Sequence, residues 1–389
     1  MSGARGGFGE LRSHPAALRL AGASVLARLP MSMFSVAAIL LLRHHLHSYA
    51  TSGAAVALYG LAAAVTSPYL GRLAARHGAH PVLVGTAAVR AGLLVALVAV
   101  AQSGVAAPVL VIAALAGGAE PPVTAVTRTT FAQLPEDARA AALSLDSILI
   151  ELVFISGPLF VGAVLAVATS GYAVVAAGIF GLVGALLMVD VDRRPSGSAT
   201  HRGGGVIRLP AVRAVAAVSL AQVVAFAAIE TASTAAANDA HHAPLVGPLA
   251  AVWALGSALG GIVYGSRRWP GSPGRRYALM AAGVGVGVAP LCTTSSPFVL
   301  LALLPIAGLF IAPSNSASSD LIAAAVPPAQ QTEAFAWVSG TATALGAAIG
   351  FGLGGAVVQT LGVRPTLAVA AAVALIGAAW PFAERRRLP

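Results

Sequence analysis

Lysine is absent from this chain of 389 residues, cysteine occurs once, and charged side chains of both signs are scarce. Without lysine the chain has no Walker A phosphate-binding loop, which excludes an ATP-driven pump within it. The single cysteine, Cys292, excludes an intramolecular disulfide and a thiolate metal cluster. The HExxH, CxxC and GxSxG motifs of membrane hydrolases and oxidoreductases are also missing, so we expect no enzyme activity, no cofactor and no metal site.

The scarcity of charge indicates a solvent other than water. Only 9% of the residues are charged, whereas soluble domains carry about 25%. Hydrophobic residues make up 58% of the chain and the mean hydropathy is +0.86, as in an integral membrane protein. The formal charge of +10 comes from arginines in short gaps between apolar runs, which indicates membrane topology and not nucleic-acid binding. We therefore expect the lipid bilayer, and no nucleic acid, as a partner.

Apolar runs of the roughly 17–25 residues that a helical span requires can be counted directly. We predict an all-α integral membrane protein with twelve spans, six in each half. A polar, glycine-rich stretch separates the halves and is typical of a flexible linker, so the predicted domains are 1–190, a linker at 191–210, and 211–389. The predicted spans lie near 16–42, 50–70, 81–101, 107–131, 140–168, 172–190, 211–237, 244–264, 277–294, 297–323, 333–359 and 364–383.

The arginines also predict the orientation. One side of the membrane receives the N-terminal, linker and C-terminal arginines, and the other side receives only Arg43 and Arg364. By the positive-inside rule, both termini and the linker are cytoplasmic. We expect a multi-pass protein of the inner (plasma) membrane.

The sequence repeats itself at a spacing of 192 residues. Without a gap, this shift lays Pro121 on Pro313 and Pro135 on Pro327. The two halves are therefore predicted to be pseudo-repeats of one six-helix unit. The shift also places Asp320 where Arg128 stands, so the copies share a scaffold and differ in charge.

Six plus six spans, a basic linker and a parallel repeat together resemble the major facilitator superfamily of secondary transporters. The loop after the second span, from Gly71 to Gly78, is similar to the family signature of a glycine, an acidic residue, an arginine and a second glycine. Ala75 stands at the acidic position, directly before Arg76. The resemblance implies the fold of that superfamily and assigns Gly71 and Arg76 to a gate.

A second stretch links the chain to one branch of that family. Gly157 and Pro158, followed by Gly162, resemble the Gly-Pro motif in the fifth span of antiporters. The resemblance therefore implies a bacterial, efflux-type transporter that works by alternating access. In this fold, spans one, four, seven and ten line a central cavity.

Ionisable residues inside the spans are the candidates for chemistry, because a charge at mid-membrane costs about 2.5–3.5 kcal/mol on insertion scales. At 1.5 Å per residue, Glu151 lies about 18 Å in from Arg139, near the middle of a ~30 Å core. Glu120 lies at a similar depth. These two carboxyls are the first candidates for the proton site, with Asp146 and Glu230 behind them; a permanent structural ion pair is the competing interpretation for each.

Other charged residues receive roles from their positions. Arg28, in the first span, is expected to be a counter-charge to Glu120 or Glu151, or a site for an anionic substrate group. Glu230 is expected to guard the outer gate. Arg128 and Asp320 are expected to bridge the halves at the inner gate, and Arg90 to snorkel or to meet a neighbouring helix.

Taken together, these features predict a proton-coupled exporter of a small apolar or amphipathic compound. Few polar residues line the spans and aromatics make up only 6% of the chain, which favours such substrates over sugars. Two alternatives remain open. One is uptake by proton symport, and the other is a transporter-like sensor or interaction protein that does not transport. We expect a monomer whose ligands are a small-molecule substrate and protons.

Overall fold

The computed structural model describes residues 11, 13–189, 206–266, 269–327, 334, 338 and 342–384. In this part of the chain, 12 helical segments are long and apolar enough to cross a membrane, which confirms the predicted number of spans. Residues 191–205 of the predicted linker lie outside the described residues, and its limits stay a prediction.

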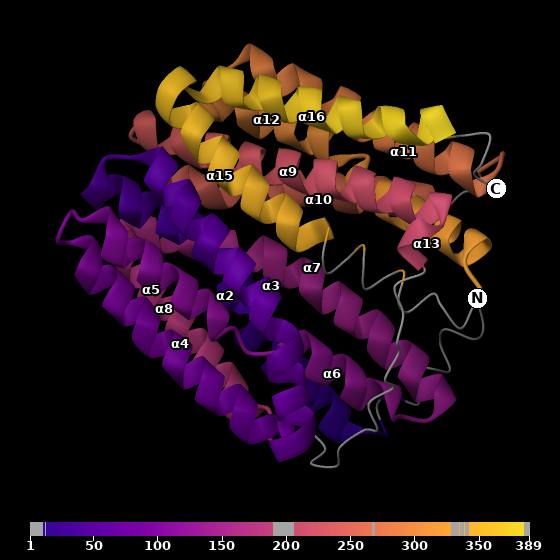
Figure 1. Ribbon diagram of the computed structural model, residues 1–389, viewed down its shortest axis with the longest axis horizontal. Coiled ribbons are helices and arrows are strands. Elements are labelled where there is room, and N and C mark those ends of the chain that lie inside the picture. Colours follow the sequence, from indigo (N-terminus) through magenta and orange to yellow (C-terminus); the bar gives the residue numbers. More distant parts are fainter. Residues whose placement is uncertain are drawn as a thin grey trace.

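The first six spans form one bundle, drawn from indigo to magenta in Figure 1. The fourth span is made of two helices, because the segment Ala119–Pro122 interrupts it. The helices of this half are α2 (Pro15–Leu46), α3 (Tyr49–His77), α4 (Ala79–Ala101), α5 (Ala106–Gly118), α6 (Val123–Ala132), α7 (Glu136–Val167) and α8 (Ser170–Leu187).

The last six spans form the second bundle, drawn from rose to yellow. Short 3-10 helices precede the α10 span and end the α11 span. The helices of this half are α9 (Pro210–Asp239), α10 (Val246–Gly265), α11 (Pro273–Val288), α12 (Pro297–Gly308), α13 (Ile311–Ala325), α15 (Thr343–Leu361) and α16 (Val363–Glu384), with 3-10 helices at Val206–Arg208, Ala243–Leu245 and Ala289–Thr293.

Helix is the expected state of these apolar segments, because inside lipid every backbone N–H and C=O group must be satisfied within the segment. Local signals set the ends. Ser48 caps α3 by accepting a hydrogen bond from the backbone N–H of Thr51 at 3.1 Å. Gly78, with φ of 94°, turns the chain between α3 and α4 in a conformation that glycine adopts without strain.

The predicted repeat is visible in the helix breaks. The fourth span breaks after Gly118, and the tenth span breaks at Leu309 and Phe310. The 192-residue shift lays Gly118 on Phe310, so both halves interrupt the same helix at the same place. The pseudo-repeat therefore holds in the backbone as well as in the sequence.

The two halves meet at the end of the bundle opposite the termini. There α3 packs on α15 and α7 packs on α10. A Cβ atom at Gly53 would lie 2.2 Å from the carbonyl oxygen of Phe351, and one at Gly162 would lie 2.6 Å from that of Pro244. Such approaches are possible only with glycine, and they close this end. Figure 1 shows the two bundles diverging from it toward the N and C marks.

Candidate functional site

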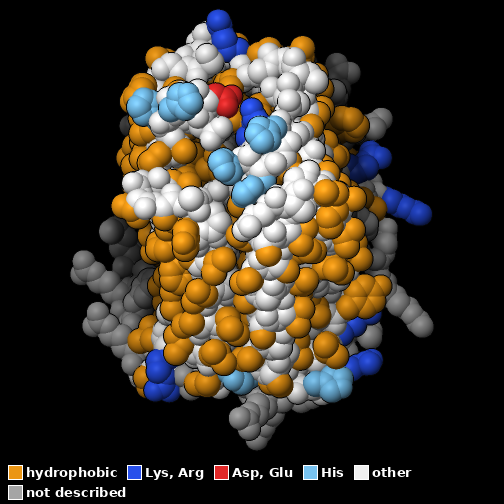
Figure 2. Space-filling view, turned by 90° about the vertical axis from the view of Figure 1, so that its left-hand side faces the viewer, with side chains coloured by type: hydrophobic (Ala, Val, Ile, Leu, Met, Phe, Trp, Pro, Cys, Tyr) orange, Lys and Arg blue, Asp and Glu red, His pale blue; other side chains and the backbone are white. Residues whose placement is uncertain are grey.

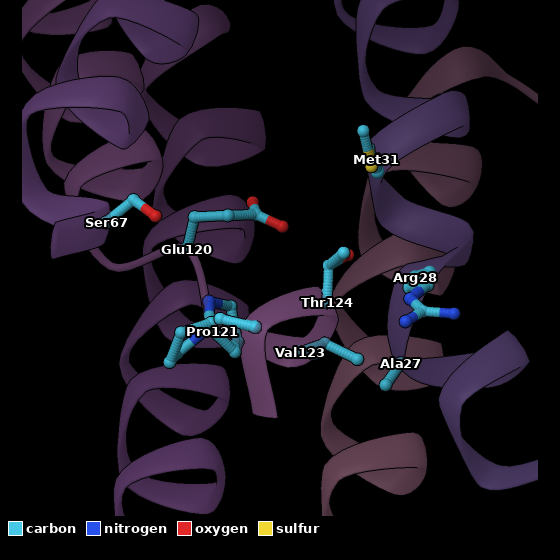
Figure 3. Close-up of a pocket in the computed structure, with 10 residues that line it drawn as sticks. Ala27, Arg28, Met31, Ser67, Glu120, Pro121, Val123 and Thr124 are labelled. Atoms are coloured by element: carbon cyan, nitrogen blue, oxygen red, sulfur yellow. The ribbon is translucent and has the colours of Figure 1, made fainter. Parts of the chain in front are cut away.

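A pocket of about 160 Å³ lies inside the first bundle, beside the break between α5 and α6. Figure 3 shows Glu120 and Ser67 on one wall and Arg28 and Met31 on the opposite wall, with Thr124 between them. The pocket is lined by Ala27, Arg28, Met31, Ser67, Glu120, Pro121, Pro122, Val123, Thr124 and Ala125.

Arg28 belongs to a cluster of three charges at the α2, α6 and α7 contact. Its Nη1 lies 2.6 Å from Oδ1 of Asp146, and both side chains are buried. The other carboxylate oxygen of Asp146 lies 3.1 Å from Nε of Arg128, whose side chain is 53% exposed. The expected pairing of Arg28 with Glu120 is therefore wrong, because α7 presents Asp146 directly to α2. Two arginines share one carboxylate, which leaves a net positive charge.

Glu120 belongs to a second cluster. Its carboxylate lies 2.7 Å from Nη1 of Arg90 and accepts a hydrogen bond from the hydroxyl of Tyr59. Arg90 does not snorkel. It is fully buried and meets neighbouring helices, because α8 carries Gly181 at this height, where a Cβ would lie 2.1 Å from Nη2 of Arg90. Tyr59 is a site residue that sequence reasoning missed, although a tyrosine in the middle of an apolar span was a signal for it.

Glu230 joins the two halves. Its Oε1 accepts a hydrogen bond from the hydroxyl of Ser35 on α2 of the other bundle. Among the described residues, Glu230 takes part in no salt bridge, in contrast to Glu120 and Asp146. Ser35 is seven residues beyond Arg28, which places this contact about 10 Å from the pocket toward the closed end. The assignment of Glu230 as a guard of the outer gate stays a prediction.

The residues assigned to gates lie apart. Arg128 and Asp320 are not paired with each other, because Arg128 contacts Asp146 and Asp320 lies 3.7 Å from Nη1 of Arg276 on α11. Both residues lie at the ends where the two bundles diverge, so each pairs with a residue of its own half. Near the end of α3, Arg76 is exposed, and a Cβ at Gly71 would meet no heavy atom within 4 Å.

The Gly-Pro motif packs helices on both sides. A Cβ at Gly157 would lie 1.9 Å from Oγ of Ser32 on α2. The carbonyl of Pro158 is 2.8 Å from the place where a Cβ on Gly247 of α10 would stand. The motif therefore allows α7 to approach both bundles closely. Glu151 lies on the same helix, before the motif, but its side chain is outside the described part of the structure.

A hydrogen-bonded latch at the closed end was not predicted. The hydroxyl of Tyr49 donates to Oδ1 of Asp239 at 2.7 Å and accepts from Nδ2 of Asn238 at 3.1 Å. The backbone N–H of Tyr49 donates to Oε1 of Gln359 at 2.7 Å. These three bonds tie α3 to α9 and α15 across the halves. Figure 2 faces this end and shows histidines gathered on it beside acidic and basic side chains.

Two pseudo-repeated six-helix bundles with buried polar groups are typical of the class of secondary transporters. The chain belongs to the Major Facilitator Superfamily, whose sequence model matches residues 20–268 and 215–389. It is therefore a multi-pass membrane transporter of small molecules and not an enzyme. No curated protein matches the chain in sequence.

Solved structures share the fold over nearly the whole chain. A bacterial homologue of the human lysosomal transporter Spinster, in an inward-facing and occupied conformation, is similar with a TM-score of 0.74 and 17% identity, covering 97% of each chain. The nucleoside transporter NupG is similar with a TM-score of 0.70 and 15% identity, covering 96% of this chain and 98% of its own. The human organic anion transporter MFSD10 is similar with a TM-score of 0.63 and 16% identity, covering 95% of this chain and 99% of its own. At such identities the likeness establishes the fold alone.

Proposed function

We propose that this transporter couples the export of a small amphipathic compound to proton entry, with Glu230 as the proton-binding group. The observation that carries the proposal is the contact of Glu230 with Ser35 at the junction of the two halves, where this carboxyl has no arginine partner among the described residues. Burying a charge without a counter-ion is costly, whereas a neutral carboxyl can stay hydrogen-bonded there. A proton at Glu230 can bind and leave without breaking an ion pair.

The other described carboxyls of the spans are less suited to this exchange. Glu120 is held by Arg90 and Tyr59, and Asp146 is shared by Arg28 and Arg128. Protonating either one would leave a buried arginine without its counter-charge, which costs about 3–5 kcal/mol. Glu120 and Glu151 stay candidates from the sequence, and the experiment below includes both.

The position of Glu230 supports a coupling role. Its partner Ser35 is on the same helix as the pocket residue Arg28 and lies between the pocket and the closed end. Gaining or losing a proton changes which hydrogen bonds the carboxyl can make across the halves. A change in that bond alters the relative energy of the two arrangements of the bundles, as alternating access requires.

An amphipathic substrate fits the mixed lining of the pocket. Alanine, methionine, valine and proline side chains lie beside two charged and two hydroxyl-bearing residues. The structural relatives do not decide the substrate, because one is described as a nucleoside transporter and another as an organic anion transporter.

Reconstituted protein tests the coupling. Full-length chain in liposomes, with the membrane potential clamped by valinomycin and potassium, receives octanesulfonate or octyltrimethylammonium as probe. An antiporter accumulates its probe when the lumen is the more acidic side, because protons that leave drive the probe in. We expect Glu230→Gln to keep exchange of labelled for unlabelled probe without a gradient and to lose pH-driven accumulation by at least tenfold.

Matched variants make the result specific. Ser35→Ala keeps the carboxyl but removes its hydrogen bond across the halves, so it should lower accumulation less than Glu230→Gln does. Glu120→Gln and Glu151→Gln are measured in parallel. Full accumulation by Glu230→Gln, together with loss of accumulation but not of gradient-free exchange in one of these two, would move the proton site to that residue. Accumulation driven only by an acidic exterior would favour symport uptake. The absence of any probe flux in all proteins would favour a sensor or interaction role.

We further propose a monomer in the inner membrane with both termini in the cytoplasm, based on the arginine asymmetry. Cysteines introduced at Ser198 and at Ser295, after replacement of Cys292 by alanine, should react with an impermeant maleimide from opposite sides. Labelling of both in intact cells would contradict the twelve-span topology, in which three spans lie between these two positions.

A further inference from the structure

The break in the fourth span exposes a helix N-terminus to the pocket. Helix α6 has ten residues and begins at Val123, directly after Pro121 and Pro122. The first N–H groups of a helix have no partner within it, and they carry the positive end of the helix dipole. Thr124 and Ala125, in this first turn, line the pocket. Anions are stabilised at such a position.

Arg28 offers free donors to the same pocket. Its side chain is 3% exposed, and within the described part of the chain its Nε and Nη2 have no hydrogen-bond partner. Only Nη1 is engaged, by Asp146 and, at 3.4 Å, by Ser24. Buried donors without acceptors are costly, so an acceptor supplied from outside would be bound favourably. An oxyanion that receives bonds from two edges of a guanidinium is the acceptor that suits this geometry.

The charges around the pocket add to the same preference. Among the described side chains, three arginines, Arg28, Arg90 and Arg128, stand against two carboxylates, Asp146 and Glu120, which leaves one positive charge in excess. Glu120 faces the pocket, but its carboxylate is already engaged by Arg90 and by the Tyr59 hydroxyl. It therefore leaves the excess positive charge on the Arg28 wall.

We propose that the pocket binds the anionic head group of an amphipathic substrate, a carboxylate, sulfonate or phosphate, between Arg28 and the N-terminus of α6. A volume of about 160 Å³ is smaller than the ~300–1,000 Å³ of pockets that enclose a drug-sized ligand, so it holds a head group and not the whole molecule. Met31, Pro121 and Pro122 provide apolar contact for the part of the substrate next to its head group. This inference rests on the proposed transport function and names its substrate class.

Binding without any gradient tests the assignment. Purified full-length protein in phosphatidylcholine nanodiscs is titrated calorimetrically with octanesulfonate, which stays charged at every working pH, and with octyltrimethylammonium. We expect wild type to bind the sulfonate at least tenfold more tightly than the cation. The double variant Arg28→Gln/Asp146→Asn removes both members of the buried pair and should weaken sulfonate binding at least tenfold.

Asp146→Asn provides a prediction of opposite sign. This substitution removes the carboxylate that competes for Arg28, so the variant should bind the sulfonate several-fold more tightly than wild type. Adding the sulfonate should also raise the melting temperature of the variant. Arg364→Gln, which removes an arginine charge from an exposed residue at the other end, should bind like wild type. Binding is measured without a pH gradient, which separates this inference from the coupling mechanism.

The outcomes are decisive in both directions. Equal affinity for sulfonate and cation, or unchanged sulfonate binding in the double variant, would overturn the inference. Should the double variant not fold, weaker binding by Asp146→Asn would overturn it as well. Sulfonate binding without pH-driven transport would instead refute only the proposed coupling. The titration is repeated in nanodiscs that contain phosphatidylglycerol. If this lipid weakens sulfonate binding in proteins that have Arg28 and not in the variant that lacks it, a lipid head group occupies the same anion site.

Discussion

The two halves share a backbone and differ in where they bury charge. The first bundle buries Arg28, Arg90 and Asp146 completely or nearly so. In the described part of the second bundle, the buried polar side chains are all neutral, as in the hydrogen bond from Nε2 of Gln222 to Oγ of Ser314 at 3.0 Å. The 192-residue shift lays Glu120 on Ala312 and Asp146 on Val338. A repeat therefore preserves helix breaks and packing while its chemistry changes.

This difference separates binding from coupling. The pocket and its ion pairs belong to one bundle, whereas Glu230 reaches that bundle from the other. Ion pairs with fixed partners hold the first bundle together, whereas Glu230 is hydrogen-bonded across the junction and, among the described residues, takes part in no ion pair. The comparison predicts that charge removal damages the first half by destabilising it and affects the second half by altering its motion.

The largest expected effect follows from breaking the Arg90 and Glu120 pair. Arg90→Gln leaves a carboxylate without its counter-charge and should destabilise the fold by about 3–5 kcal/mol. Glu120→Gln should do similar damage by leaving Arg90 buried alone. The double variant should recover much of the loss. Thermal unfolding in detergent measures all three.

The second half provides the control for that comparison. Gln222→Leu removes a neutral hydrogen bond and should cost only about 1 kcal/mol. Equal destabilisation by Arg90→Gln and Gln222→Leu, or additive losses from Arg90 and Glu120, would show that the charge difference between the halves does not govern stability.

Much of the architecture was predictable because hydropathy and length decide it. Twelve spans and the pseudo-repeat needed only composition and spacing, since lipid permits little else than helix in such segments. Arg28 and Glu120 do lie at one pocket, as expected from their spans.

The partners of these charges were not predictable, because they depend on how each helix is rotated against its neighbours. Arg28 meets Asp146 and not Glu120, and Arg90 turns inward because Gly181 leaves room on a helix far away in sequence. The Tyr49 latch depends on three helices that meet only after the halves have assembled. Nothing local at Tyr49 indicates its contact with Asp239.

The next effect in size concerns that latch. Tyr49→Phe removes its hydrogen bonds with Asp239 and Asn238, and a bond to a charged acceptor contributes about 1.5–3 kcal/mol. Opening of this end should become at least tenfold more frequent. In a Cys292→Ala background, a cysteine at Ala57, which is buried and lies near Gly352 of α15, should react with maleimide correspondingly faster.

A matched substitution controls for the loss of a hydroxyl in the latch experiment. Tyr172 is 67% exposed on α8, and Tyr172→Phe should leave the labelling rate at Ala57 unchanged. An unaltered rate in Tyr49→Phe would mean that glycine packing alone, and not the hydrogen bonds, closes this end.

The smallest effect on stability is expected at Arg128 and Asp320, the repeat positions with opposite charge. Asp320 is half exposed and 3.7 Å from Arg276, and exposed pairs contribute about 0–1 kcal/mol, so Asp320→Asn should hardly change the melting temperature. A bridge between Arg128 and Asp320 stays a prediction for the arrangement in which the diverging ends close. Either neutralisation should then slow transport, because it weakens that arrangement.

Exchanging the two charges is a poor test of this bridge, because an aspartate at 128 would face Asp146. The double neutralisation Arg128→Gln/Asp320→Asn is cleaner. If the two residues act only through each other, the double variant transports no more slowly than the slower single variant. If the two residues act independently, the double variant should instead lose transport rate by the product of the two single fold-reductions. Because stability barely changes in any of these variants, a transport defect measured in proteoliposomes reports on the motion that brings the halves together and not on the folded fraction.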